Sequence, residues 1–170
     1  VMPHLMFVAP KGCGKTTLAK AVARRLKRID DAKRYFEINC STIKNVKQFF
    51  NQLVIPIMQD RDATILFDEC SEIPKDVTMA LLTILNPNPD NLTTFSYEDY
   101  TVDFDFRRLS FMFATTETQS VFHALMDRLE RVDLEEYTLD EMGQIVNLNL
   151  DIDIDSKTLQ DIASVLRGNA

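Results

Sequence analysis

The feature that most constrains the fold is a loop near the start of the chain, Ala9-Pro-Lys-Gly-Cys-Gly-Lys-Thr16. It matches the phosphate-binding pattern G-x-x-x-x-G-K-[ST] except at the first position, where Ala9 replaces glycine. A compact apolar run at residues 4–9 predicts a buried strand before the loop. An apolar stripe at helical spacing predicts a helix from Thr16 to about Arg28 after it. Strand, loop and helix in this order predict a nucleotide-binding site rather than a chance glycine turn.

The chemistry of this loop depends on its backbone and on two side chains. Glycines let consecutive N–H groups point inward at phosphate oxygens, and the helix N-terminus adds its positive end. Lys15 can reach the β- and γ-phosphates, and the Thr16 hydroxyl can bind Mg²⁺. Ala9 is tolerated if its φ is negative, as expected at the end of a strand. The residues predicted to bind ATP are Pro10, Lys11, Gly12, Cys13, Gly14, Lys15, Thr16 and Thr17.

A second motif, Ile65-Leu-Phe-Asp-Glu69, is an apolar strand that ends in two acids. After a phosphate loop, the first acid can hold the water shell of Mg²⁺, and the second can orient and polarise the attacking water. We therefore assign the metal to Thr16 and Asp68 and the activation of water to Glu69. The alternative is that both acids are solvated residues that happen to follow a strand.

The remaining pattern alternates strands with helices, which predicts a parallel sheet with helices on both faces. Further strands are predicted at residues 35–39, 63–67 and 109–114. Ser41 or Thr42 is predicted to cap a helix that passes Val54 and ends near Pro56, and another helix is predicted at residues 77–85. Alternating residues from Leu92 to Phe106 predict a β-hairpin inserted before the strand at 109–114. We divide the chain into an αβα nucleotide-binding domain, 1–136, and the beginning of a helical lid, 137–170.

Charge and composition limit the cellular setting. The formal net charge is −7, so the chain as a whole does not attract the phosphate backbone of a nucleic acid. One early helix is nevertheless rich in lysine and arginine. We interpret that basic run as a solvated helix face rather than a nucleic-acid patch. No apolar run is long enough to span a membrane, and the start lacks a secretory signal. Three cysteines without metal-ligand spacing suit reduced thiols, and we expect a cytoplasmic protein.

Taken together, the phosphate loop, Asp68-Glu69, the polar Ala114-Thr-Thr116 and Asp127-Arg128 resemble the AAA+ ATPases. Four segments most resemble the RuvB family of Holliday-junction branch-migration motors. They are His4-Leu-Met-Phe-Val-Ala-Pro-Lys-Gly-Cys-Gly-Lys-Thr-Thr-Leu-Ala19, Phe113-Ala-Thr-Thr116, Leu125-Met-Asp-Arg128 and Tyr137-Thr-Leu-Asp-Glu-Met142. The resemblance implies a P-loop NTPase fold, ATP and Mg²⁺, a homo-oligomeric ring such as a hexamer, and duplex or branched DNA as partner.

The resemblance also assigns roles to single residues. Thr116, or less favourably Thr115, falls at the sensor position that reports on the γ-phosphate. Arg128 falls at the position of an arginine finger, which stabilises charge on the γ-phosphate bound by a neighbouring subunit. Arg131 is a weaker candidate, and a surface salt bridge of Arg128 with a nearby acid is the alternative. Tyr137 matches a tyrosine that lines the adenine pocket, although it could equally be a core residue.

The chain departs from the RuvB pattern at one place besides Ala9. Leu129-Glu130 stands where an aromatic residue and glycine usually follow the finger. The family's second sensor arginine and its winged-helix DNA-binding region are expected beyond the last residues, so we expect the chain to be a fragment.

Three functions therefore stay open. The first is a DNA motor, the second a clamp-loader-like or scaffolding ATP-binding module, and the third a protein remodeller of the MoxR type. The hairpin is expected to pack within the domain, with a partner-binding role as the alternative.

Overall fold

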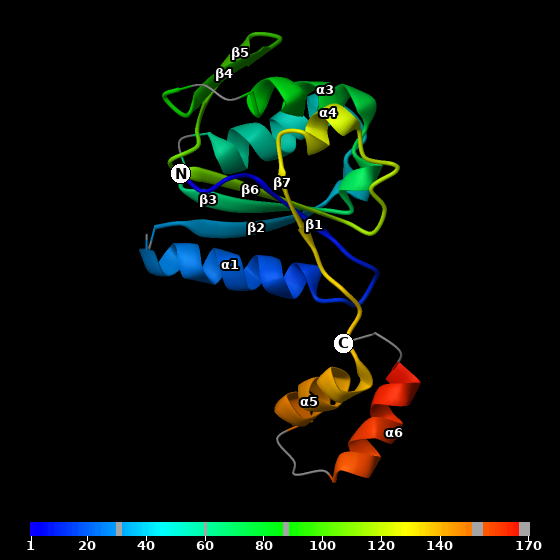
Figure 1. The fold of residues 1–170 in the computed structure, drawn as a ribbon. Helices are drawn as coiled ribbons and strands as arrows, with labels where there is room; N and C mark the ends of the chain where they lie inside the picture. Colours follow the sequence, from blue (N-terminus) through cyan, green and yellow to red (C-terminus); the bar gives the residue numbers. More distant parts are fainter. Residues whose placement is uncertain (30–31, 60, 87–88, 151–154, 167–170) are drawn as a thin grey trace.

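The computed structural model describes residues 1–29, 32–59, 61–86, 89–150 and 155–166. Its centre is a parallel sheet of five strands in the order β2-β3-β6-β1-β7, which confirms the predicted α/β class (Figure 1). Most of the short strands are rich in apolar residues, as expected for a sheet covered on both faces. In chain order they are β1 (Leu5–Val8), β2 (Arg34–Asn39), β3 (Ala63–Asp68), β6 (Leu109–Thr115) and β7 (Glu130–Asp133).

Helices cover both faces of this sheet, as predicted. Helix α1 (Lys15–Ile29) lies on one face, where its Ala19 and Ala23 are buried against the strands. The opposite face carries a second group of helices, which lie together above the sheet in Figure 1. These are α2 (Val46–Phe49), the π-helical η2 (Phe50–Met58), α3 (Lys75–Ile84) and α4 (His123–Met126). No helix in the described part of the chain has the length and apolarity needed to cross a membrane.

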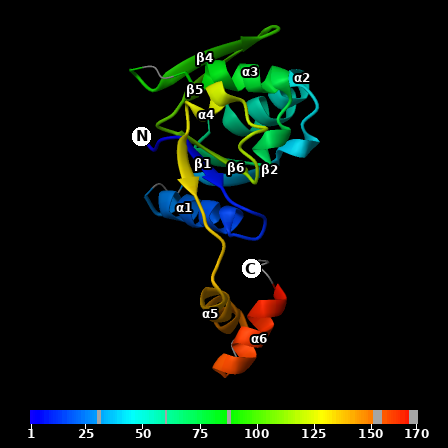
Figure 2. The same cartoon turned by 45° about the vertical axis from the view of Figure 1, so that its right-hand side comes forward.

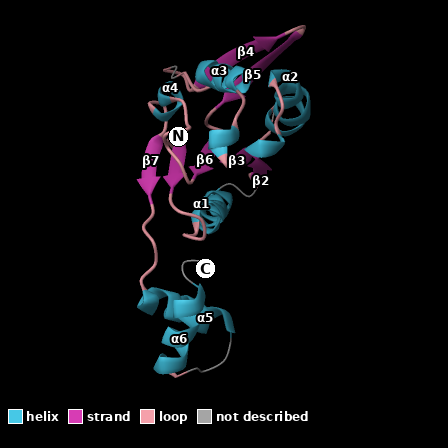
Figure 3. Cartoon of the chain, turned by 90° about the vertical axis from the view of Figure 1, so that its right-hand side faces the viewer, coloured by secondary structure: helices cyan, strands magenta, loops and turns pink. Residues whose placement is uncertain are grey.

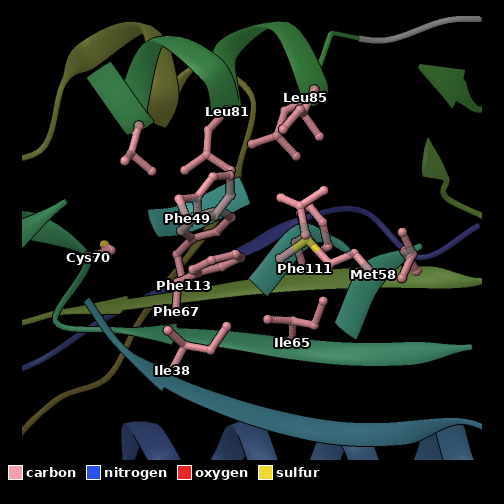
Figure 4. Close-up of a cluster of buried hydrophobic side chains, with 14 of the residues drawn as sticks. Ile38, Phe49, Met58, Ile65, Phe67, Cys70, Leu81, Leu85, Phe111 and Phe113 are labelled. Atoms are coloured by element: carbon pink, nitrogen blue, oxygen red, sulfur yellow. The ribbon is translucent and has the colours of Figure 1, made fainter. Parts of the chain in front are cut away.

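The larger of the two cores lies on the face opposite α1 and is built around phenylalanine rings (Figure 4). Phe67 of β3 stacks on Phe113 of β6, with ring centroids 4.9 Å apart and planes at 15°. Phe111 meets Phe67 edge-on at 5.6 Å, and all three rings are fully buried. Aromatic pairs in these geometries add stability beyond the area they bury. This core joins β3 to β6, the two strands whose carboxyl ends carry Asp68, Glu69 and Thr116.

The predicted cap of the second helix is wrong. Ser41 and Thr42 lie in a separate 3₁₀ turn, η1 (Cys40–Thr42), and the side chain of Asn45 caps α2 by accepting from the Gln48 N–H. The helix then continues as η2, where the Gln59 N–H donates to the carbonyl of Val54 at 3.0 Å, five residues back. This wider spacing is typical of a π-helix, and the segment contains Pro56, which has no N–H to donate.

The predicted hairpin is present as β4 (Leu92–Tyr97) and β5 (Tyr100–Asp105), an antiparallel pair outside the main sheet (Figure 2). One face packs against the domain, since Val102 and Phe104 are buried and Phe50 lies 5.3 Å from the Tyr97 ring. The other face is polar: the Thr94 hydroxyl donates to Asp103. Packing within the domain is therefore confirmed.

The last part of the described chain contains β7, α4 and two further helices. Strand β7, flanking β1 at the end of the sheet, and α4 were not predicted. Beyond β7 the chain descends to α5 (Leu139–Leu150) and α6 (Ser156–Leu166), which pack on each other apart from the sheet (Figure 3). A Cβ on Gly143 would touch Leu159 at an ordinary 3.6 Å, so glycine is not required for that contact.

Candidate nucleotide site

The predicted phosphate loop joins β1 to α1. Gly12 and Gly14 have φ values of +85° and +80°, in the left-handed region that favours glycine. The non-glycine residues with positive φ in the described chain are Glu69, Asn91 and Glu98. Ala9 is not among them, so the expectation that its backbone tolerates a Cβ is confirmed.

Lys15 points back over this loop. Its ammonium group donates to the carbonyl oxygens of Ala9 at 2.8 Å and Pro10 at 2.9 Å. Burial lowers the pKa of Lys15, while the nearby Asp68 and Cys13 act in the opposite direction. The lysine is thus held at the loop, and its carbonyl partners can be exchanged for phosphate oxygens, which bind a cation more strongly.

The parallel register brings the predicted residues to one edge of the sheet. Asn39 pairs with Asp68, and Val8 with Thr115, so the loop and the ends of β3 and β6 meet at the carboxyl ends of the strands. This is where open parallel sheets bind ligands. A cavity of about 600 Å³ opens there. It is lined by Lys11, Gly12, Gly14, Lys15, Thr16, Thr17, Asp68, Glu69, Ser71 and Thr116.

The two acids after β3 differ in conformation. Glu69 has φ 54° and ψ 46°, and its N–H donates to the Asp68 carboxylate at 3.0 Å. A left-handed glutamate costs about 1–3 kcal/mol and persists only when its surroundings impose it. Such strain concentrates at functional positions, and here it occurs at the residue predicted to activate water.

The two candidate sensor threonines are separated clearly. The Thr115 side chain is buried, donates to the carbonyl of Glu117 at 2.9 Å and accepts from the Glu117 N–H at 3.1 Å. Thr116 is exposed and lines the cavity. The position of Thr116 therefore suits contact with a phosphate, whereas Thr115 shapes the turn after β6.

A second cavity of about 450 Å³ adjoins the first, and both include Gly14 and Thr17. Tyr137 lies on its wall, and a Cβ on Gly14 would come within 2.7 Å of the tyrosine Oη. Both apolar and polar side chains line this cavity, as expected for a base and ribose. The lining also includes Cys13, Leu18, Ala21, Asp133, Leu134 and Glu135.

These features fit a magnesium nucleotide. Mg²⁺ is usually bound by one or two protein oxygens together with substrate phosphates, rather than by a cage of protein ligands. Thr16 and Asp68 supply such oxygens on the same cavity, and the described residues hold no cluster of three or more metal-ligating side chains elsewhere. ATP and Mg²⁺ therefore fit the residues present.

Arg128 lies at the opposite edge of the sheet. It precedes β7, whose first residue Glu130 pairs with Leu5 at the start of β1. Its Nη1 donates to the carbonyl of Ala124 at 2.7 Å, and in the described chain it makes no ion pair. Arg131 is instead paired with Asp133 at 2.7 Å. The structure thus separates Arg128 from the phosphate loop of its own chain.

Several lining residues were missed from the sequence. Ser71 follows Glu69 with no motif of its own, and residues 133–135 reach the second cavity only because β7 lies beside β1. Strand β7 reads Glu-Arg-Val-Asp, and this charged pattern gave no strand signal. The only available hint was the position of this segment just before Tyr137.

Comparison with known proteins identifies the family. The model of the "ATPase family associated with various cellular activities (AAA)" matches residues 5–137. The chain belongs to the AAA family of ATPases. The α/β fold, the nucleotide-binding loop and ATPase membership agree with the resemblance to AAA+ proteins drawn from the motifs.

Curated relatives from the family are Lon proteases. Lon protease 1 of Bdellovibrio bacteriovorus is 26% identical over 165 residues, covering 86% of this chain and 20% of the relative. The mitochondrial Lon protease homologue 1 of Dictyostelium discoideum is 29% identical over 161 residues, covering 84% of this chain and 16% of the relative. The chain thus spans about a fifth of the length of these relatives.

Solved AAA structures give a second comparison. The Thermotoga maritima RuvB P216G mutant superposes with a TM-score of 0.77 at 21% identity, covering 99% of this chain and 51% of that one. The T. maritima RuvB Holliday junction branch migration motor superposes with a TM-score of 0.73 at 21% identity. This match covers 99% of this chain and 50% of that one. This likeness shows the fold. The resemblance to RuvB is confirmed in fold alone, and the curated relatives named above are Lon proteases.

Proposed function

We propose that the chain is the ATP-hydrolysing module of a ring-forming motor in which each ATP is cleaved between two copies. Lys15 binds the β- and γ-phosphates, Thr16 and Asp68 hold Mg²⁺ and its water shell, and Glu69 activates the attacking water. Thr116 contacts the γ-phosphate, and Tyr137 lies against the adenosine. Mg²⁺ supplies neutralisation of the phosphate charge that develops during transfer.

The observation that carries this proposal is the placement of the residues on two edges of one sheet. The phosphate loop, Asp68 and Thr116 meet at the carboxyl ends of the strands, and Arg128 lies at their amino ends. Arg128 therefore cannot complete its own site without refolding, but a second copy stacked edge to edge can present its arginine there. This geometry favours a closed ring of identical subunits, such as a hexamer.

Mixing two variants tests this arrangement. Arg128→Ala subunits keep an intact nucleotide cavity, and Glu69→Gln subunits keep an intact arginine. We expect each variant alone to be nearly inactive and an equimolar mixture to recover a substantial part of wild-type turnover. Full activity of Arg128→Ala alone at every protein concentration would contradict the proposal. Nucleotide affinity, measured with a fluorescent ATP analogue, serves as the control and should be unchanged in Arg128→Ala.

Two substrates have support. Duplex or branched DNA is favoured by the segments that resemble the RuvB family, and α1 and β2 border a groove lined by basic residues. The basic residues that line this groove are Lys20, Arg24, Lys27, Lys33 and Arg34. Lys20 is already paired with Glu37 at 3.0 Å.

A polypeptide substrate is favoured by the curated relatives, since those matched at 26–29% identity are Lon proteases. The net charge of −7 agrees with this alternative because it opposes DNA binding. In this case the chain would act as a protein remodeller, as also expected for the MoxR type.

One turnover experiment separates these substrates. ATPase rate is measured with branched DNA, with duplex DNA and with an unfolded protein such as casein. Stimulation by DNA that falls with added salt supports the DNA motor, and stimulation by casein alone supports the remodeller. ATP-dependent association without turnover supports the scaffolding module instead.

The remaining parts of the proposal concern organisation. We take residues 1–136 as the nucleotide-binding domain and residues 137–170 as the beginning of a helical lid, in a cytoplasmic protein. The hairpin from Leu92 to Phe106 is proposed to contact a protein partner through Tyr100, whose side chain is 52% exposed. Both tyrosine rings lie near Phe50, Tyr97 at 5.3 Å and Tyr100 at 6.3 Å, but only Tyr100 is among the exposed large hydrophobic residues and therefore suits a probe. Unchanged binding of a captured partner by Tyr100→Ser would exclude this contact.

A further inference from the structure

The amino-end edge of the sheet contains a cavity of its own. It has a volume of about 440 Å³, and its lining includes His4, Asn86, Asn91, Phe106 and Arg128. His4 immediately precedes β1, and its carbonyl oxygen accepts from the Glu130 N–H at 2.7 Å. The pairing of β1 with β7 therefore places His4 beside the segment that carries Arg128.

Two polar atoms in the residues around this cavity lack partners. In the described chain, the buried side-chain nitrogens or oxygens without a hydrogen bond are His4 Nδ1, Arg128 Nε and Thr64 Oγ1. The first two belong to residues that line the same cavity. A buried polar atom without a partner costs about 1–3 kcal/mol, so such atoms are rare without a reason. Two of them around one cavity indicate a ligand that supplies hydrogen-bond acceptors from outside.

The ring of His4 is held firmly in place. Phe106 packs edge-on against it with centroids 4.7 Å apart and planes at 76°, and Phe111 lies at 5.7 Å. Burial lowers the pKa of His4 to about 4, so the ring is neutral near pH 7. A neutral, clamped imidazole with hydrogen on Nδ1 donates a directed hydrogen bond without adding charge. Arg128 supplies the charge: its Nη1 donates to the carbonyl oxygen of Ala124, and its Nε is buried without a hydrogen-bond partner.

We propose that His4 acts beside Arg128 as a second donor, and that the two together receive an oxygen of the γ-phosphate bound by the neighbouring copy. This inference rests on the proposed role of Arg128 between subunits. A phosphate oxygen accepts from both Arg128 Nε and His4 Nδ1, and satisfies both buried groups at once. His4 thereby fixes the direction of approach, which a long arginine side chain alone does not determine.

Two substitutions separate hydrogen bonding from packing. His4→Asn places an amide nitrogen near the position of Nδ1, whereas His4→Phe keeps the aromatic contact with Phe106 but removes the donor. Each is combined with Glu69→Gln, so that the altered subunit can only donate its arginine. The donor is then mixed with Arg128→Ala subunits, whose own nucleotide cavity performs the hydrolysis.

We expect donors with His4→Phe to stimulate the neighbouring site about 10- to 100-fold less than donors with His4 intact. The loss should fall on kcat rather than KM, and donors with His4→Asn should recover most of it. The second readout is ATP-dependent association of the mixed subunits, measured by sedimentation velocity. Association should be weakest for His4→Phe donors and closer to that of His4-intact donors for His4→Asn. Urea midpoints of the two variants verify folding.

Each outcome of these mixing experiments either supports or contradicts the proposed role of His4. Equal stimulation by His4→Phe donors and His4-intact donors would overturn the role of His4 while leaving that of Arg128 standing. Equal losses with His4→Asn and His4→Phe would also overturn it, because packing alone would then explain the effect. If donors with His4 intact fail to stimulate Arg128→Ala subunits, the proposed function fails and this inference with it.

Discussion

The two edges of the sheet differ in how complete they are. At the carboxyl edge, three strands and a glycine loop deliver a lysine, a threonine and two acids into one cavity, so this edge can bind a nucleotide by itself. At the amino edge, Arg128 and His4 each keep a buried atom without a partner. This difference supports the proposal that hydrolysis needs two copies of the chain, one supplying the nucleotide cavity and the other supplying Arg128.

The largest expected effect is on the carboxyl edge. Glu69→Gln should lower ATP turnover about 10²- to 10⁴-fold, because an amide cannot accept a proton from water. Nucleotide affinity should hold, since Lys15 and Thr16 are untouched. Wild-type subunits added in trans should not restore hydrolysis at the altered site, unlike Arg128→Ala. If they do restore it, the two edges are not distinct in the way the structure indicates.

The next expected effect is on the stability of the core, which supports both edges of the sheet. Phe67→Ala removes the ring that stacks on Phe113 at the centre of the core and should reduce the free energy of unfolding by about 3–5 kcal/mol. Leu148→Ala is the matched control, because Leu148 is 84% exposed in α5 and should change little. Urea denaturation followed by circular dichroism measures both. Equal destabilisation by the two substitutions would contradict the assignment of the core.

The smallest expected effect is on ATP affinity and concerns the carboxyl edge alone. Gly14→Ala forces a Cβ onto a left-handed residue and against Tyr137 Oη, and should weaken ATP binding about 10- to 100-fold. Ala9→Gly restores the glycine of the usual pattern and should leave affinity unchanged, while lowering stability by about 0.5–1 kcal/mol. Isothermal titration with ATP measures both. An equal loss of ATP affinity in the two variants would contradict the requirement for glycine at position 14.

Local signals predicted most of the fold. Strand, loop and helix around Lys15 were recognisable because glycine, apolar periodicity and a helix start all agree there. The alternation of β4 and β5 was equally clear. The cap of α2 was misplaced because Ser41, Thr42 and Asn45 are all good capping residues, and the tertiary position of the turn selects among them. Strand β7 was missed because a short charged segment becomes a strand only by pairing with β1.

The sequence by itself predicted the chemistry of the carboxyl edge: which residues would contact phosphate, which would hold Mg²⁺ and which acid would activate water. These residues form contiguous motifs, and their spacing encodes local backbone geometry. Only the tertiary structure decided that Thr116 rather than Thr115 faces the cavity, and that Arg128 and His4 share a cavity at the far edge. The physical reason is strand register, because parallel pairing brings together residues more than a hundred positions apart, and no local pattern records which neighbour a strand will choose.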